Sequence, residues 1–170
     1  MEAIQTGLPG LVLVRPKVFQ DERGFFLEGW QREKFAALGI DADFMQDNHA
    51  RSGPAGVLRG LHFQRPPSAQ GKLIGVELSA ENFLRLFVPR GIAHGYLTLT
   101  PDAEFQYKVD APYSPQHDAG LIWNDPDLAV PWPAVPGQEG GGPVLSAKDK
   151  ILPLFKDFVS PFVYEAPAAG

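Results

Sequence analysis

The sequence predicts an all-β domain, a barrel or a sandwich, with one clear helix. Several short segments are rich in β-branched and aromatic residues, whereas only Gln31–Gly39 has the composition of a helix. The 18 glycines and 17 prolines punctuate the chain, which suits many short strands joined by turns. A chain of 170 residues is long enough for one domain with a substantial core.

Strands are predicted where apolar, β-branched or alternating runs lie between turn signals. In chain order these runs are Leu11–Phe19, Phe25–Trp30, Asp43–Arg51, Gly56–Gln64, Gly71–Leu78, Phe83–Pro89, Ala93–Leu99 and Ala103–Asp110. Pro16 favours an edge or a bulge within the first run. Within the run Asp43–Arg51, alternation of side chains places Gln46 and Asn48 on one face of the strand.

The remaining segments predict a helix, a loop and a helical turn. Gln31–Gly39 contains good helix formers around the apolar pair Phe35 and Leu38, and it ends in glycine. Pro131–Pro143 is rich in glycine and proline, which predicts an irregular surface loop. Ser146–Phe155 predicts one helical turn.

The composition limits the partners and the chemistry. The formal net charge of −5 gives no general attraction to nucleic acid or to an anionic membrane. No apolar run approaches the roughly 20 residues of a transmembrane helix, and the N-terminus has no signal-peptide pattern. The chain has no cysteine, which excludes disulfides and thiol nucleophiles and fits a reducing cytoplasm.

The stretch GVLRGLHFQ, Gly56–Gln64, places Arg59 and His62 inside an apolar strand. Burying either group without a partner is costly, so these two residues indicate a lined pocket. Strict alternation puts Arg59 and His62 on opposite faces, and a bulge at Gly60 would turn both the same way. An imidazole with an unperturbed pKa of about 6.5 suits a general base near neutral pH, although a structural histidine is the alternative.

Other polar residues have two interpretations each. Gln46 and Asn48 suit either sugar hydroxyls or cross-strand hydrogen bonds. The cations Arg23, Arg59 and Lys72 suit either phosphate oxygens or surface ion pairs.

Two further groups depend on their neighbours. Tyr107 shares a strand face with Phe105 and Val109, which favours a core position, but its phenol could also donate a proton. Asp149 has the pattern of an ordinary surface turn and gains a role only beside His62.

Metal binding stays an alternative at this point. The histidines His49, His62, His94 and His117 are scattered, and no H-x-H pair or H-E-x-x-H motif occurs. Three of them could still converge in space. The sequence has no phosphate-binding loop of the P-loop or dinucleotide type.

Together, these stretches resemble the dTDP-4-keto-6-deoxyhexose 3,5-epimerases, of the dTDP-4-dehydrorhamnose 3,5-epimerase type. The matching stretches, in family order, are Pro16–Trp30, Gln46–Ser52, Gly56–Leu73, Val76–Asn82, Val88–Leu99, Ala103–Pro133 and Leu145–Asp149. The resemblance implies a cupin-like jelly roll forming a single domain over residues 1–170, usually a homodimer, that works without metal or nicotinamide. The implied substrate is a dTDP-4-keto-6-deoxy sugar nucleotide, epimerised at C3, at C5 or at both in dTDP-rhamnose-type biosynthesis.

The resemblance also implies roles for individual residues. His62 matches the catalytic base, Asp149 its carboxylate partner and Tyr107 the acid that returns a proton. Lys72 and Arg59 match groups near the keto oxygen and the phosphates, and Lys72 is counted among the catalytic residues. The substrate-binding positions are matched by Arg23, Phe26, Glu28, Gln46, Asn48, Arg59, His94 and Tyr113.

The chain departs from the family pattern between Lys72 and Val76. Roughly two dozen residues of the family have no counterpart here, which is room for two or three strands. In the family, the absent run carries an aspartate near the active-site lysine. Three explanations of the deletion are open. The coding sequence is truncated or mis-assembled; the chain is a natural or deliberately shortened variant whose sheet rearranges or borrows strands from a partner subunit; or the chain is a non-catalytic relative. Because of the deletion, the first alternative function is an inactive sugar-nucleotide-binding or structural relative. The second alternative is a metal-dependent cupin enzyme.

Overall fold

The computed structural model describes residues 1–63, 73–138 and 140–158. Strands predominate in this part of the chain, and all of the paired strands are antiparallel. Two compact units form, one from Met1–Met45 with Lys72–Pro89 and the other from Gln46–Gly71 with Arg90–Gly170. In the described ranges, no helix has the length and apolar character needed to cross a membrane.

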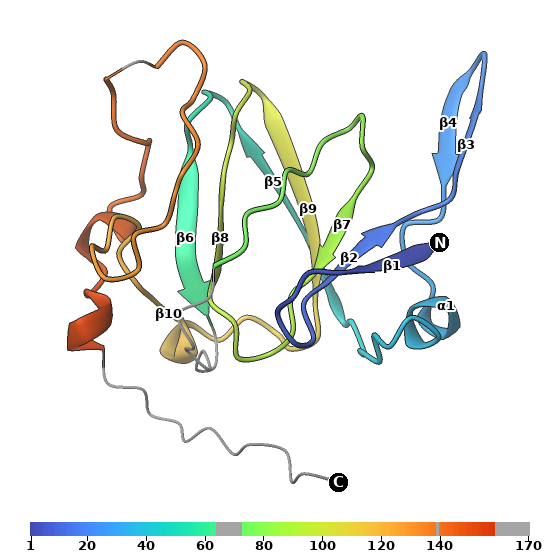
Figure 1. Ribbon diagram of the computed structural model, residues 1–170, viewed down its shortest axis with the longest axis horizontal. Coiled ribbons are helices and arrows are strands. Elements are labelled where there is room, and N and C mark those ends of the chain that lie inside the picture. Colours follow the sequence, from blue (N-terminus) through green and yellow to red (C-terminus); the bar gives the residue numbers. More distant parts are fainter. Residues whose placement is uncertain (64–72, 139, 159–170) are drawn as a thin grey trace, which may run out of the picture. The chain divides into compact units, whose positions relative to one another are not determined.

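The first unit contains a three-stranded sheet, a two-stranded ribbon and a short helix (Figure 1). Its elements are β1 (Glu2–Gln5), β2 (Val12–Arg15), β3 (Val18–Asp21), β4 (Gly24–Leu27), α1 (Arg32–Ala36) and β7 (Arg85–Phe87). The sheet order is β1-β2-β7, and β3 pairs with β4. The buried core of this unit consists of Val12, Val14, Phe35 and Ile40.

The helix α1 lies within the predicted segment but is shorter than expected. The side chain of Gln31 accepts a hydrogen bond from the backbone N–H of Lys34 at 2.7 Å, which caps the first turn. Gly39 has a φ of 84°, a conformation that stops a helix at little cost. Phe35 is the buried residue that anchors this helix to the core.

Within its described residues, the second unit contains two sheets and three 3₁₀ turns (Figure 1). Its elements are β5 (Gln46–Ser52), β6 (Leu58–Phe63), β8 (His94–Leu97), β9 (Ala103–Val109), β10 (Ala119–Gly120), η1 (Pro115–His117), η2 (Asp149–Ile151) and η3 (Phe155–Asp157). The sheets have the orders β10-β6-β8 and β5-β9. Leu61, Phe63 and Leu121 are buried together, and aromatic residues of the C-terminal segment pack against them.

Strand β6 has the irregularity that its sequence predicts. Arg59 pairs with Tyr96 and His62 pairs with His94, so β6 uses one more residue than β8 between these pairs. Gly60 lies at this position with a φ of 144°, and a β-carbon there would lie 2.6 Å from Cα of Gly95. The bulge brings Arg59 and His62 to the same face, away from the buried side chains of the strand.

Two strand predictions differ from the structure. The run Leu11–Phe19 is divided at Pro16, between β2 and β3. The predicted strand Gly71–Leu78 is wrong over residues 73–78, which form no strand because no neighbouring strand pairs with them in the described structure; its first two residues lie outside the described residues. The predicted loop at Pro131–Pro143 is confirmed over residues 131–138 and 140–143, and the predicted helical turn is confirmed as η2.

Candidate active site

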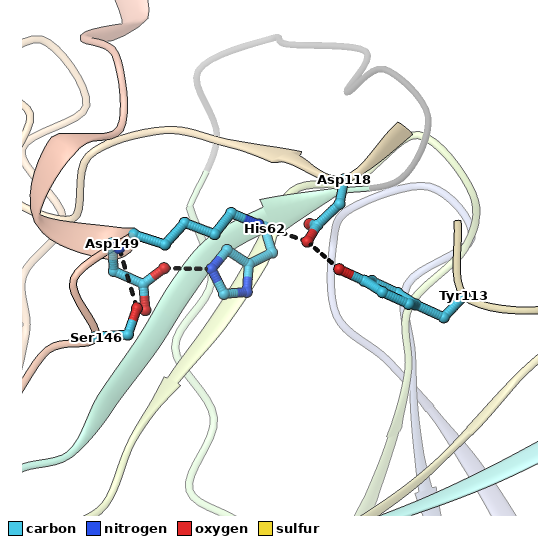
Figure 2. Close-up of polar contacts among 6 residues, drawn as sticks. His62, Tyr113, Asp118, Ser146 and Asp149 are labelled. Carbon is cyan, nitrogen blue, oxygen red and sulfur yellow. Dashed lines mark hydrogen bonds and ion pairs between the residues drawn. The ribbon is translucent and has the colours of Figure 1, made fainter. Parts of the chain in front are cut away.

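His62 faces a buried carboxylate. Its Nε2 lies 2.6 Å from Oδ1 of Asp149, and the two side chains are 32% and 4% exposed (Figure 2). A carboxylate at this distance holds the imidazole in one orientation and stabilises its protonated form. The interpretation of Asp149 as an ordinary surface residue is therefore wrong, because its side chain is buried in contact with His62.

Local structure fixes both members of this pair. Asp149 is the first residue of η2, and its backbone N–H donates to Oγ of Ser146 at 3.1 Å (Figure 2). His62 projects from β6 next to the bulge, and its register partner on the other side is Gly120 of β10. The exposed part of the imidazole remains available to a ligand.

A small pocket of about 140 Å³ lies along β5 and β9. Its lining residues are Gln46, Asn48, Tyr107, Val109, Ala111 and Tyr113. Four of these six are residues for which the sequence predicts a catalytic or substrate-binding role. The structure therefore brings these four predicted site residues together in the wall of one pocket.

The two amides of this wall bind each other along one strand. Nε2 of Gln46 donates to Oδ1 of Asn48 at 2.9 Å, and Asn48 pairs with Tyr107 in the β5–β9 register. Among the described residues, these two amide side chains form this contact within β5 and not the cross-strand hydrogen bonds expected as the alternative. Both amides keep further donors and acceptors for a polar ligand.

Tyr107 is open to the pocket instead of being buried in the core. It is 43% exposed, although its ring lies 5.5 Å from that of Phe105. Phe105 in turn stacks on Tyr96, with 4.3 Å between the ring centroids. Tyr107 is therefore the outer end of a row of three aromatic rings. The core interpretation of Tyr107 is wrong, and a phenol at the pocket surface suits proton donation.

Two predicted substrate-binding residues, His94 and Arg59, lie near His62. Desolvation by the surrounding protein lowers the pKa of the His94 imidazole; a backbone hydrogen bond with Ile92 opposes this effect, and the neighbouring His62 adds to it. The neutral form of this imidazole is therefore favoured. Arg59 is exposed on β6, and within the described ranges no carboxylate pairs with it, so its guanidinium is available to an anionic ligand.

Three predicted substrate-binding residues belong to the first unit. Arg23 pairs with Asp21 in the turn between β3 and β4, and Glu28 pairs with Lys34 at 2.7 Å. Phe26 is 71% exposed on β4. Their place in a substrate pocket stays a prediction, as does the role of Lys72, which lies outside the described residues.

The described residues contain no group of three side chains that could hold a metal ion. His49 pairs with Glu104 at 2.8 Å on the outer face of β5, and Nδ1 of His117 lies 2.8 Å from Oγ of Ser114.

Two residues without a distinctive sequence pattern, Asp118 and Lys148, lie beside this site. Oδ2 of Asp118 accepts hydrogen bonds from Oη of Tyr113 at 2.8 Å and from Nζ of Lys148 at 2.5 Å (Figure 2). The only signals in the sequence are that Asp118 follows Tyr113 across one turn and that Lys148 directly precedes Asp149. Neither signal is specific without the fold.

Comparison with known proteins decides the family. A family model described as dTDP-4-dehydrorhamnose 3,5-epimerase matches residues 5–76 and 71–157. The chain belongs to this family. Membership confirms the resemblance predicted from the sequence.

Individual members of the dTDP-4-dehydrorhamnose 3,5-epimerase family cover nearly the whole chain. The Salmonella typhimurium enzyme is 41% identical over 91% of this chain and 95% of its own length. The Pseudomonas aeruginosa enzyme is 38% identical over 92% and 97%. A solved structure from Legionella pneumophila, a dTDP-6-deoxy-D-glucose-3,5-epimerase in complex with dTDP-4-keto-L-rhamnose, has a TM-score of 0.86 at 33% identity over 97% and 99%. The predicted all-β, cupin-like fold is thus confirmed.

The comparisons also bear on the predicted deletion. The match to the Salmonella enzyme spans 180 residues, more than the 170 of this chain, of which it uses 91%. The family model matches in two stretches that meet at residues 71–76, where the deletion is predicted. Both observations support a family segment that is absent from this chain.

Proposed function

We propose that this chain epimerises a dTDP-4-keto-6-deoxyhexose at C3, C5 or both, next to its keto group, in the biosynthesis of a dTDP-rhamnose-type sugar. The observation that carries the proposal is the pair formed by His62 and the buried Asp149, in a chain that belongs to an epimerase family. A base that is oriented by a buried carboxylate suits the removal of a proton from carbon.

The first step is removal of a C–H proton beside the carbonyl. Loss of this proton forms an enolate, in which the negative charge moves onto the keto oxygen. His62 takes the proton at its free ring nitrogen, and Asp149 stabilises the resulting imidazolium. The carboxylate also prevents the ring from rotating away from the substrate.

The enolate must be stabilised because imidazole is a much weaker base than the carbanion. A cation near the keto oxygen provides this stabilisation, and Lys72 is proposed for it. Arg59, exposed on the same face of β6 as His62, is proposed to bind the diphosphate. Neither step needs a metal or a nicotinamide.

Reprotonation from the opposite ring face completes the inversion. Tyr107 is proposed as the donor, because its phenol carries the O–H group that can give a proton to the enolate carbon. Its position in the pocket wall with Gln46 and Asn48 supports this role, because both amides suit sugar hydroxyls. The substrate-binding roles of Arg23, Phe26, Glu28, His94 and Tyr113 belong to the same proposal.

We propose one domain over residues 1–170, acting as a homodimer in the cytoplasm. The β3–β4 ribbon supports the dimer because it exposes Phe19, Phe25 and Phe26, and exposed apolar surface of this kind is commonly covered by a partner. The absence of cysteine is consistent with the reducing cytoplasm.

The test is exchange of solvent deuterium into the keto sugar. Purified protein is incubated with dTDP-4-keto-6-deoxyglucose in heavy water, and deuterium at C3 and C5 is followed by NMR. We expect incorporation with the wild-type chain and none with His62→Ala. His49→Ala is the matched control, since His49 lies on the outer face of β5.

The deletion favours one second candidate, an inactive sugar-nucleotide-binding relative. Binding of dTDP-4-keto-6-deoxyglucose without any exchange, by protein with an intact circular dichroism spectrum, would replace the proposed activity with this one. Exchange that depends on added metal would instead support a metal-dependent cupin enzyme.

A further inference from the structure

The carboxylate of Asp118 joins two side chains at the edge of the site. Tyr113 and Lys148 both donate to its Oδ2, at 2.8 and 2.5 Å (Figure 2). The side chain of Asp118 is 18% exposed, so water has limited access to this carboxylate. Tyr113 itself is 56% exposed and lines the pocket on β5 and β9.

The chain ties this cluster to the catalytic pair. Asp118 directly precedes β10, whose Gly120 is the register partner of His62. Lys148 directly precedes Asp149, so two consecutive residues of one turn bind Asp118 and His62. A displacement of this turn would disturb both contacts together.

The hydrogen bonds determine what the Tyr113 oxygen can do. The hydrogen bond to Asp118 is the largest of the effects that raise the pKa of Tyr113, and the phenol therefore stays protonated. Burial acts to raise the pKa of Asp118, but the hydrogen bonds from Lys148 and Tyr113 outweigh it and lower that pKa. A phenol whose single hydrogen is given to a carboxylate has only lone pairs left for a ligand.

We infer that Asp118, held in place by Lys148, is a positioning residue that fixes the Tyr113 hydroxyl as a hydrogen-bond acceptor for a hydroxyl group of the bound sugar. The role toward the sugar rests on the proposed function. Lys148 also neutralises the carboxylate, so that Asp118 does not repel the anionic nucleotide.

The test measures the titration of Tyr113 by NMR in protein labelled with ¹³C at Cζ of tyrosine. Four tyrosines give four signals, and Tyr113→Phe assigns the one that disappears. We expect Tyr113 to titrate at lower pH in Asp118→Asn and at higher pH in Lys148→Met, since Lys148 acts to lower the pKa of Tyr113. A merely structural disturbance would move the signal in the same direction in both variants. Lys150→Met, an exposed lysine of the same turn, is the control and should leave the titration unchanged.

Kinetics then test the role toward the sugar. Asp118→Asn and Tyr113→Phe should each raise KM about five- to tenfold. The KM of the double variant should be no higher than that of either single variant, because both substitutions remove the same interaction. Additive effects, or a Tyr113 signal that does not respond to Asp118→Asn, overturn the inference even if the wild-type enzyme is active. An inactive wild-type chain with shifted titrations overturns the proposed function but leaves the hydrogen-bonded arrangement standing.

Discussion

Gly120 lies directly against His62. A β-carbon on Gly120 would lie 3.3 Å from Cδ2 of the imidazole and 2.5 Å from the backbone oxygen of Leu61. That oxygen accepts the hydrogen bond of the Leu121 backbone N–H at 2.9 Å, so it cannot retreat without breaking the pairing of β6 with β10. The space for the catalytic ring therefore depends on the absence of a side chain at position 120.

Gly120→Ala should destabilise the protein and impair the proposed activity. The clash with the Leu61 carbonyl is with backbone, and overpacking of this kind costs about 1–3 kcal/mol. Urea denaturation measures the loss, and deuterium exchange measures the effect on His62. Gly53→Ala is the control because its β-carbon would meet no atom within 4 Å. Equal unfolding midpoints for the two variants would contradict the clash.

Asp149→Asn should lower the rate of deuterium exchange by a factor on the order of 10²–10⁴. A neutral amide can hold the imidazole in the wrong tautomer and does not stabilise the imidazolium. The rate is measured at saturating substrate, with unfolding followed in parallel. Asp157→Asn changes an exposed carboxylate of η3 and should leave the rate unchanged. A wild-type rate in Asp149→Asn would remove the carboxylate from the mechanism.

Tyr107→Phe should separate proton loss from inversion. The base still removes the C–H proton, so deuterium continues to enter the substrate, whereas formation of the epimer falls by a factor on the order of 10² or more. Exchange in the recovered substrate serves as the internal control for binding and for His62. Equal losses of exchange and epimer formation would show that Tyr107 does not act on the second step alone.

The sequence predicted the arrangement around His62 well because local rules govern it. Glycine at position 60 and the apolar residues of β6 indicated a bulge that brings Arg59 and His62 to one face, and the register confirms it. Alternation likewise predicted that Gln46 and Asn48 share a face, and both line the pocket. Each of these predictions depends on neighbours within a few residues.

Contacts between distant segments were not visible in the sequence pattern. Asp149 is 87 positions from His62, and only the family resemblance connected the two residues. Asp118 and Lys148 were missed because a turn carboxylate and a turn lysine are common, and their pairing depends on the register of β10 with β6. The predicted strand over residues 73–78 failed because a strand needs a hydrogen-bonding neighbour, which its own sequence does not provide.

Asp125 anchors the C-terminal segment to the second unit. Asp125 is only 1% exposed. Its Oδ1 accepts hydrogen bonds from the backbone N–H groups of Asp127 and Leu128, both at 2.8 Å, and its Oδ2 accepts one from the backbone N–H of Phe155 at 2.7 Å. Phe155 packs against the core that underlies β6. Asp125→Asn places an amide N–H₂ against one of these donors and should cost about 1.5–3 kcal/mol of unfolding free energy. Asp127→Asn, an exposed change in the same turn, is the control.

The destabilisation in Asp125→Asn should depend on pH in one direction. Burial acts to raise the pKa of Asp125, but the three backbone hydrogen bonds outweigh it and lower the pKa below its ordinary value of 3.8. A carboxyl group with a lowered pKa in the folded state stabilises the protein above its unfolded pKa, and this stabilisation is lost as the pH falls through the folded value. The difference between wild type and Asp125→Asn should therefore be full at pH 7 and should shrink below about pH 4, as urea denaturation at several pH values will measure. A difference that stays constant between these pH values would mean that the charge of Asp125 does not stabilise the fold.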